Sequence, residues 1–210
     1  MMVDTGGRRT LLLVLVVGSG IGCLLLLGYL LWADVLGLTP ATAAPPAPTR
    51  ALIGLWDAYE EARAAAQAQA ADARLVSAAT QWQAVSEEAL LAGASNWSFV
   101  FYSPASSSSL DVGVSAGTAR VVNQTRVWVA PTAMVEGTWQ AGPRDALMAF
   151  LAYGGRAFLD KYPQAMVDLH LAESDGGGPV WTIVALDPED RSLLSLLIDA
   201  DTGQVLSVAP

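Results

Sequence analysis

The segments WSFVFYSPASSSSLDVGVSAGTARVV (Trp97–Val122) and WTIVALDPEDRSLLSLLIDADTGQVL (Trp181–Leu206) align with each other without a gap. They lie 84 residues apart, and eight of their 26 aligned positions are identical. The identities include the leading tryptophans and two prolines, Pro104 and Pro188. A fixed offset of this kind indicates an internal repeat. The alternative is a pair of unrelated hairpins that share apolar patterning, but matched tryptophans and prolines favour duplication.

Apolar and polar residues alternate in both segments, which predicts half-buried antiparallel strands. Prolines, serines and aspartates between the alternating runs predict turns. Each segment ends in a further strand after a tight turn, at Ala116–Thr118 and at Asp199–Gly203. The residues expected to face the core are Trp97, Phe99, Phe101, Leu110, Val112 and Val114 in the first segment, and Trp181, Ile183, Ala185, Leu194, Leu196 and Ile198 in the second.

A helix and one more strand are expected before each segment. The first helix, Arg50–Ala73, is rich in helix formers and carries Leu52, Leu55, Trp56, Tyr59 and Ala62 at helical spacing. The second begins at Pro143 and ends at Tyr162-Pro163, with a kink or break predicted at Gly154-Gly155. The added strands are Arg74–Trp82 and Met166–Ala172.

The predicted architecture is therefore α+β, with two tandem α-β-β-β-β repeats that form antiparallel sheets. Repeat 1 spans residues 51–127, a connector spans 128–142, and repeat 2 spans 143–210. Units of this size have small cores and are marginally stable alone. We therefore expect the two repeats to share an interface or a continuous sheet.

A membrane anchor is predicted at the N-terminus. Residues 11–32 contain no charge and are long enough to cross a bilayer as a helix. Arg8 and Arg9 precede this run, which favours a cytoplasmic N-terminus and an extracytoplasmic C-terminal part. We expect residues 1–34 to be a short cytoplasmic tail and a transmembrane helix, and residues 35–50 to be a Pro/Ala-rich linker.

Two other interpretations of the N-terminus remain open. Ala41-Thr42-Ala43 is an A-x-A pattern typical of signal-peptide cleavage, although it lies well past the apolar run. Cys23 follows Gly20-Ile21-Gly22 and would be the modified residue of a lipoprotein. The apolar residues that continue after Cys23 favour a small residue inside a membrane helix instead.

Composition excludes several function classes. The formal net charge is −9 and the pI is about 4.4, which argues against binding of nucleic acid. One Cys and one His leave no disulfide framework, no Cys-x-x-Cys pair and no multi-Cys zinc site. The preference for Arg over Lys and the abundance of Ala are typical of a GC-rich, bacterial genome.

No residue carries a strong signal for catalysis, a cofactor or a metal, so none is assigned to these roles. Asp199-x-Asp201-x-Gly203 lacks the later ligands of a calcium loop and predicts a hairpin turn. His170 is expected on the solvent face of its strand or against the other repeat, without a nucleophile nearby. The acids Asp187, Glu189 and Asp190 are expected to be solvated, and Gly176–Pro179 is expected to be a flexible loop.

Six tryptophans lie after the apolar run: Trp56, Trp82, Trp97, Trp128, Trp139 and Trp181. The favoured interpretation is core packing, because small units need large buried area. A second interpretation places Trp128 and Trp139 along a binding groove between the repeats.

The second repeat resembles the PepSY family of cystatin-like α+β domains. The resemblance rests on the helix DALMAFLAYGGRAFLDKYP, the strand MVDLHLA and the ending LLIDADTGQVLSV. The first repeat lacks the Asp-x-Asp-x-Gly turn and has a longer insert at Gln83–Ser95, so it resembles the family as a diverged copy. The resemblance implies a binding or regulatory module outside the membrane, in some members protease-inhibitory, without common catalytic residues.

We therefore expect a membrane-anchored, non-enzymatic extracytoplasmic protein that recognises a protein or peptide partner at a sheet edge or a groove. The alternative is a small-ligand receptor or an enzyme that uses the hollow of a cystatin-like cone. A deep pocket with converging polar groups would favour the alternative.

Overall fold

The computed structural model describes residues 52–135, 137–174 and 176–209. The predicted tail, transmembrane helix and linker, residues 1–50, lie outside the described residues, as does the first residue of repeat 1. Among the residues that are described, no helix has the length and apolarity needed to span a membrane.

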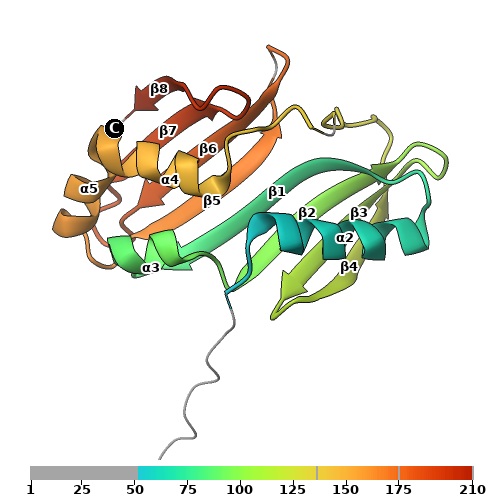
Figure 1. Ribbon diagram of the computed structural model, residues 1–210, viewed down its shortest axis with the longest axis horizontal. Helices are drawn as coiled ribbons and strands as arrows, with labels where there is room; N and C mark the ends of the chain where they lie inside the picture. Colours follow the sequence, from blue (N-terminus) through green and yellow to red (C-terminus); the bar gives the residue numbers. More distant parts are fainter. Residues whose placement is uncertain (1–51, 136, 175, 210) are drawn as a thin grey trace, which may run out of the picture. The chain divides into compact units, whose positions relative to one another are not determined.

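Eight strands form one antiparallel sheet in the order β4-β3-β2-β1-β5-β6-β7-β8 (Figure 1). In each half of the sheet, neighbouring strands are consecutive in sequence and are joined by hairpins or longer connections. The strands are β1 (Arg74–Gln83), β2 (Asn96–Ser103), β3 (Ser108–Ser115), β4 (Thr118–Arg126), β5 (Met166–Glu173), β6 (Pro179–Leu186), β7 (Leu193–Asp199) and β8 (Val205–Ala209). This arrangement confirms an α+β fold with four antiparallel strands in each half.

The two halves meet where β1 pairs with β5. The pairing is antiparallel and runs from Ser77 opposite Ala172 to Gln83 opposite Met166 without a register shift. The ladder therefore continues from one half into the other, which confirms the expectation of a continuous sheet. The described residues between 52 and 209 belong to one compact unit.

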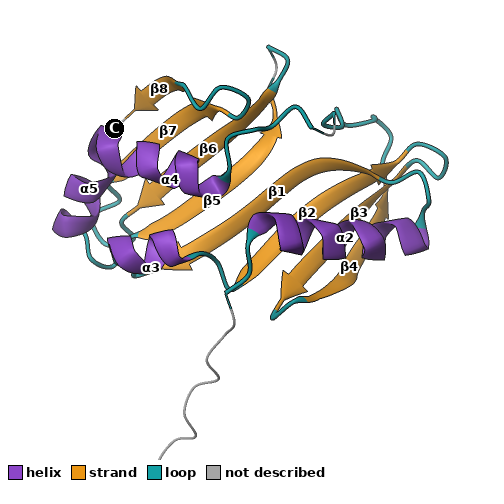
Figure 2. Cartoon of the chain, viewed as in Figure 1, coloured by secondary structure: helices purple, strands orange, loops and turns teal. Residues whose placement is uncertain are grey.

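The helices lie along one face of the sheet (Figure 2). In the first half, α2 (Leu55–Gln69) packs against β2, β3 and β4, and α3 (Glu87–Ala92) contacts the helix that follows the connector. In the second half, α4 (Pro143–Phe150), η1 (Leu151–Gly155) and α5 (Arg156–Lys161) follow one another. The side chains of the sheet that face these helices form the core.

The residues predicted to face the core do so. All twelve of the strand positions named above are buried, with exposed fractions of at most 9%. Leu55, Tyr59 and Ala62 on α2 cover the first half, and Ala146, Leu147 and Phe150 on α4 cover the second. Alternation therefore predicted correctly which face of each strand is covered.

The predicted helix break is present. Tyr153 and Gly154 have non-helical backbone angles, and Gly154 has a φ of 111°, which favours glycine. Gly155 is buried against Phe150, and a Cβ at Gly155 would lie 2.5 Å from a carbon of that ring. The two glycines thus let the chain turn closely over its own preceding helix.

Equivalent tryptophans bind equivalent points of the two halves. The Trp97 indole Nε1 donates to the carbonyl of Ile53, at 3.2 Å, and the Trp181 Nε1 donates to the carbonyl of Ala141, at 2.8 Å. Both carbonyls lie two residues before a helix, α2 or α4. Each tryptophan is buried on the second strand of its half and ties that strand to the start of the helix.

Three details of the prediction need correction. Helix α2 spans Leu55–Gln69 rather than Arg50–Ala73, because the chain turns at Ala71–Ala73 before β1. Trp56 and Leu52, which were expected on the apolar stripe of the helix, are about half exposed, and Leu52 lies before the helix begins. The insert Gln83–Ser95 contains α3, which was not predicted; Leu90 anchors this helix in the core.

Candidate functional site

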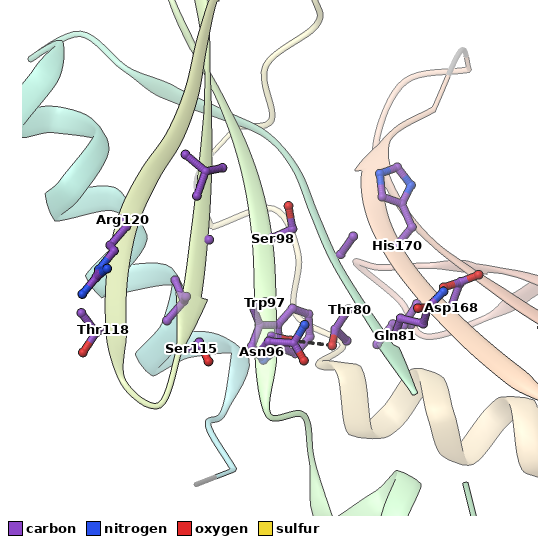
Figure 3. A pocket seen from close by; sticks show the side chains of 15 residues that line it. Thr80, Gln81, Asn96, Trp97, Ser98, Ser115, Thr118, Arg120, Asp168 and His170 are labelled. Carbon is purple, nitrogen blue, oxygen red and sulfur yellow. Dashed lines mark hydrogen bonds between the residues drawn. The ribbon is translucent and has the colours of Figure 1, made fainter. Parts of the chain in front are cut away.

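The face of the sheet opposite the helices carries a hollow of about 870 Å³. Strands β1 to β5 line it, and Figure 3 shows their side chains along the curled sheet. Residues here alternate with the buried ones; for example, Ser98 lies between Trp97 and Phe99. We call this site the open-face hollow, and define it by Ala79, Gln81, Ser98, Gly113, Arg120, Val122, Asp168 and His170.

A hydrogen bond between two side chains crosses the junction between the two halves inside the hollow. Gln81 on β1 donates from its Nε2 to Asp168 Oδ1 on β5, at 2.7 Å. These two residues are directly opposite in the β1–β5 register. The carboxylate of Asp168 thus has a partner, and the pair helps to fix the register at the floor of the hollow.

His170 lies next to this pair, between Ala79 of β1 and Thr182 of β6 in the sheet register. Its ring is exposed, as was predicted, and Figure 3 shows it projecting from the sheet. Partial desolvation by its neighbours on the sheet lowers the pKa of His170 from its ordinary value. The imidazole is therefore biased toward its neutral form.

The lining offers hydrogen-bond donors and acceptors beside small residues such as Ala79 and Gly113. Nucleophilic catalysis needs a nucleophile hydrogen-bonded to a base that is itself oriented. Among the described residues, no hydrogen bond joins His170 to a serine. The arrangement is suited to holding a ligand by shape and hydrogen bonds.

Neither the turn acids nor the Asp-x-Asp-x-Gly segment forms a metal site in the described part of the chain, where no cluster of three His, Cys, Asp or Glu side chains occurs. Asp199 Oδ1 accepts the backbone N–H groups of Asp201 and Thr202, at 2.9 and 2.8 Å. The Thr202 N–H is the main reason that the pKa of Asp199 is lowered. With Gly203 at a φ of 74°, this confirms the predicted hairpin turn.

The turn at Asp187–Asp190 is only partly solvated. Asp187 is buried and accepts the backbone N–H of Asp190 at 2.6 Å, whereas Glu189 and Asp190 are exposed. The prediction of three solvated acids was therefore wrong for Asp187, because its carboxylate closes the β6–β7 turn. The Gly176–Pro179 segment joins β5 to β6, and Gly177 and Gly178 have positive φ.

A polar cluster that the sequence did not indicate lies at the end of α5. Ser192 donates to the Tyr162 hydroxyl at 2.8 Å, and the Lys161 ammonium lies 4.8 Å from the centroid of the same ring. Hydrogen bonds from Lys161 and then Ser192 lower the pKa of Tyr162. Ser192 lies in a distant turn, so sequence spacing alone gives no signal for this cluster.

The connector tryptophans do not line the hollow together. Trp139 is buried and packs edge-on against Trp56 and Tyr59, with ring centroids 5.0 and 5.5 Å apart. Trp128 is 91% exposed, and the Arg126 guanidinium lies 5.6 Å from its ring centroid. Packing therefore explains Trp139, whereas neither core packing nor a shared groove with Trp139 explains Trp128.

Comparison with known proteins identifies a domain in the second half. Residues 156–209 match the sequence profile of the PepSY family, described as "Peptidase propeptide and YPEB domain". The match begins at α5 and includes β5 to β8. It confirms the resemblance of repeat 2, over about a quarter of the chain.

No curated protein matches the chain. A crystal structure of a "putative lipoprotein" from Clostridium difficile 630 has 12% sequence identity and a TM-score of 0.46, covering 72% of this chain and 91% of that one.

Proposed function

We propose that the protein is a membrane-anchored, extracytoplasmic and non-enzymatic module, built from two PepSY-like halves, that binds a protein or peptide partner on the open face of its sheet. The observation that carries the proposal is the open-face hollow. It spans five strands, is lined by both halves, and is not covered by any described helix.

The proposal includes a diverged PepSY-like copy in the first half, and the order of elements there supports it. The family match covers residues 156–209 alone. The first half nevertheless repeats its order of one helix and four strands, and both halves repeat the bond from a tryptophan indole to the chain before the helix. Duplication followed by divergence of the Ser115–Ala119 turn and of the α3 insert accounts for both observations.

The placement outside the membrane rests on the sequence. An uncharged run at residues 11–32 follows Arg8 and Arg9, and a proline-rich spacer separates it from the described residues. A chain with −9 formal charge is repelled by anionic headgroups, so its hollow is suited to a protein ligand rather than to the lipid surface.

Labelling of intact cells tests the location. We expect a membrane-impermeant maleimide to label Ser98→Cys in a Cys23→Ser background without permeabilisation, because Ser98 is exposed on the open face. Labelling that occurs solely after permeabilisation would contradict an extracytoplasmic location.

Site-specific photo-crosslinking tests the binding site. A photoreactive amino acid at Ser98 is expected to give a discrete protein adduct in intact cells, and the same group at Ala64, exposed on α2, is expected not to give it. Identical adducts at both positions, or no adduct at Ser98, would argue against a partner on the open face. Full activity assays are not needed, since the readout is contact.

A further inference from the structure

The outer edge of the sheet at β4 differs from the rest of this acidic protein. Strand β4, TARVVNQTR, contains Arg120 and Arg126 and no acidic residue, although the chain has a formal net charge of −9. Neither arginine forms an ion pair within the described part of the chain. The edge is thus a local positive region on a negative molecule.

The same edge exposes large apolar side chains. Val122 on β4 is 69% exposed, and Trp128 and Val129 just after it are 91% and 83% exposed. Arg126 lies over the Trp128 ring, which places a cation and an aromatic side chain together beside the strand. We call residues 118–129 the β4 edge.

An edge strand has one side without a neighbour, and so leaves backbone N–H and C=O groups available for another strand. Proteins often protect such edges with a short strand, a proline, charged side chains, a bulge or a cover. Here β4 is nine residues long, has no proline, and lies at one end of the strand order. Its protective features are the two arginines, whose charge an acidic ligand would neutralise, and a bulge at Val122, where the register with β3 shifts.

From these features we infer that the β4 edge binds an acidic peptide segment in extended conformation, which adds to the sheet as a ninth strand. Backbone hydrogen bonds along β4 supply affinity, as in other cases of strand addition. Carboxylates of the segment pair with Arg120 and Arg126, and an apolar side chain covers Val122 or Trp128. This inference names the chemistry of the partner proposed above, and it rests on that proposal.

The geometry favours such a partner over a second copy of this chain. Pairing β4 with β4 of another copy would bring two arginines from each strand to one edge, with no acidic residue on either strand to offset them. Arg120 and Val122 also line the open-face hollow. A strand added at this edge therefore extends the wall of the hollow.

Peptide binding to the full-length protein in detergent micelles tests the inference. The probe is a fluorescein-labelled peptide of about nine residues, mostly Thr and Val, with two Glu placed about five residues apart. This odd spacing is needed because the bulge at Val122 puts Arg120 and Arg126 on opposite faces of the sheet. Matched peptides carry Gln or Lys in place of Glu. Two further peptides keep Glu but carry N-methyl groups at alternate residues. One blocks the backbone N–H groups along one edge of the peptide, and the other blocks those along the opposite edge.

The expected order of affinity by fluorescence anisotropy is Glu peptide, then Gln peptide, then Lys peptide. Arg120→Gln and Arg126→Gln should each weaken the Glu peptide by roughly tenfold, the scale of one charge-assisted contact. Arg191→Gln, an exposed arginine in the β6–β7 turn, is the control with the same charge change and should have no effect. One of the two N-methylated versions should lose binding.

Three results would overturn the inference. The first is equal binding of the Glu and Lys peptides, and the second is a loss of affinity in the Arg191→Gln control equal to that in the β4 variants. The third is binding of both N-methylated peptides. Absence of all peptide binding would also overturn it, as would a dimer in ultracentrifugation that Arg120→Gln strengthens. If the crosslinked adduct at Ser98 forms equally in the Arg120→Gln/Arg126→Gln variant, the open-face partner stands and the β4 assignment fails.

Discussion

Two tryptophan indoles perform the same task in the two halves. Each donates a hydrogen bond from a buried position to a carbonyl just before a helix. Trp97→Phe and Trp181→Phe should each lower the free energy of unfolding by about 1–3 kcal/mol, because each leaves a carbonyl without its partner and a gap in the core. Urea unfolding followed by circular dichroism measures the change.

Trp128→Phe is the matched control for that pair. Its ring is 91% exposed, so the change should stay within about 0.5 kcal/mol. A loss at Trp128 equal to that at Trp97, or no loss at either buried tryptophan, would mean that the two indoles do not fix the helices to the sheet.

His170 predicts a dependence of stability on pH. Its pKa is lowered in the folded protein, so the unfolded chain binds a proton more readily. Stability from this group is fully present above the unfolded pKa of about 6.5 and is lost as the pH falls through the folded value. Chemical unfolding between pH 7.5 and about 5 should show this decrease in the wild type.

The variant His170→Gln should lose that part of the pH dependence while it keeps the acid loss at lower pH. Asp72 and Asp199 also have lowered pKa values, through backbone N–H groups of Ala105 and Thr202 first, and they destabilise the protein when protonated at lower pH. An unchanged slope near pH 6 in the variant would show that His170 is not its source.

At the residue level, the sequence predicted burial on the strands better than on the helices. Period-two alternation places every second strand residue on one face, and the covered face is then decided by its apolar residues. Helical spacing gave a wider stripe, so Trp56 was assigned to the core although about half of it is exposed and it packs against Trp139. The hollow is lined by strands of both halves, and no residue pattern in the sequence specifies the β1–β5 register that brings those strands together.

Among the helices and strands, the break between α4 and α5 depends on a single residue, Gly155. A Cβ there would lie 2.5 Å from the Phe150 ring, and Phe150 is fully buried and cannot move freely. Gly155→Ala should therefore destabilise the protein by about 1–3 kcal/mol through overpacking. Thermal unfolding measures this loss.

Gly176→Ala provides the comparison. Its added Cβ would meet only a serine oxygen at 3.9 Å, and its backbone has no positive φ, so stability should change by less than about 0.5 kcal/mol. If Gly155→Ala were equally neutral, the chain would not turn so closely over Phe150.

Helix α3 shows why short elements escape prediction. Ser86 caps it by accepting the Ala89 N–H at 3.2 Å, and Glu87 and Glu88 occupy its first turn. This start signal is present in the sequence, but six residues are too few to show helical periodicity. The helix is held by distant partners, because Leu90 is buried in the core and Arg156 binds Glu87 through both carboxylate oxygens, at 2.6 and 2.7 Å.

Across the whole molecule, the two halves share a ladder at β1–β5 and the Glu87–Arg156 contact. Two such halves should unfold in one cooperative step, because neither keeps its central strand pairing without the other. Trp97→Phe should consequently lower the protection of backbone amides against hydrogen exchange in β6 and β7 as well as in β2. Two separate transitions, with only the first half affected, would contradict this coupling.

Strands β1 and β5 join the two halves in one sheet, with Gln81 opposite Asp168. Disulfide trapping of Gln81→Cys/Asp168→Cys in a Cys23→Ser full-length chain tests this pairing, since paired residues have Cα atoms within bridging distance. We expect rapid, nearly complete oxidation of this pair and little oxidation of Gln81→Cys/Glu173→Cys, because Glu173 lies five residues from Asp168 along β5. Equal, slow oxidation of both pairs would show that β1 and β5 do not pair in this register.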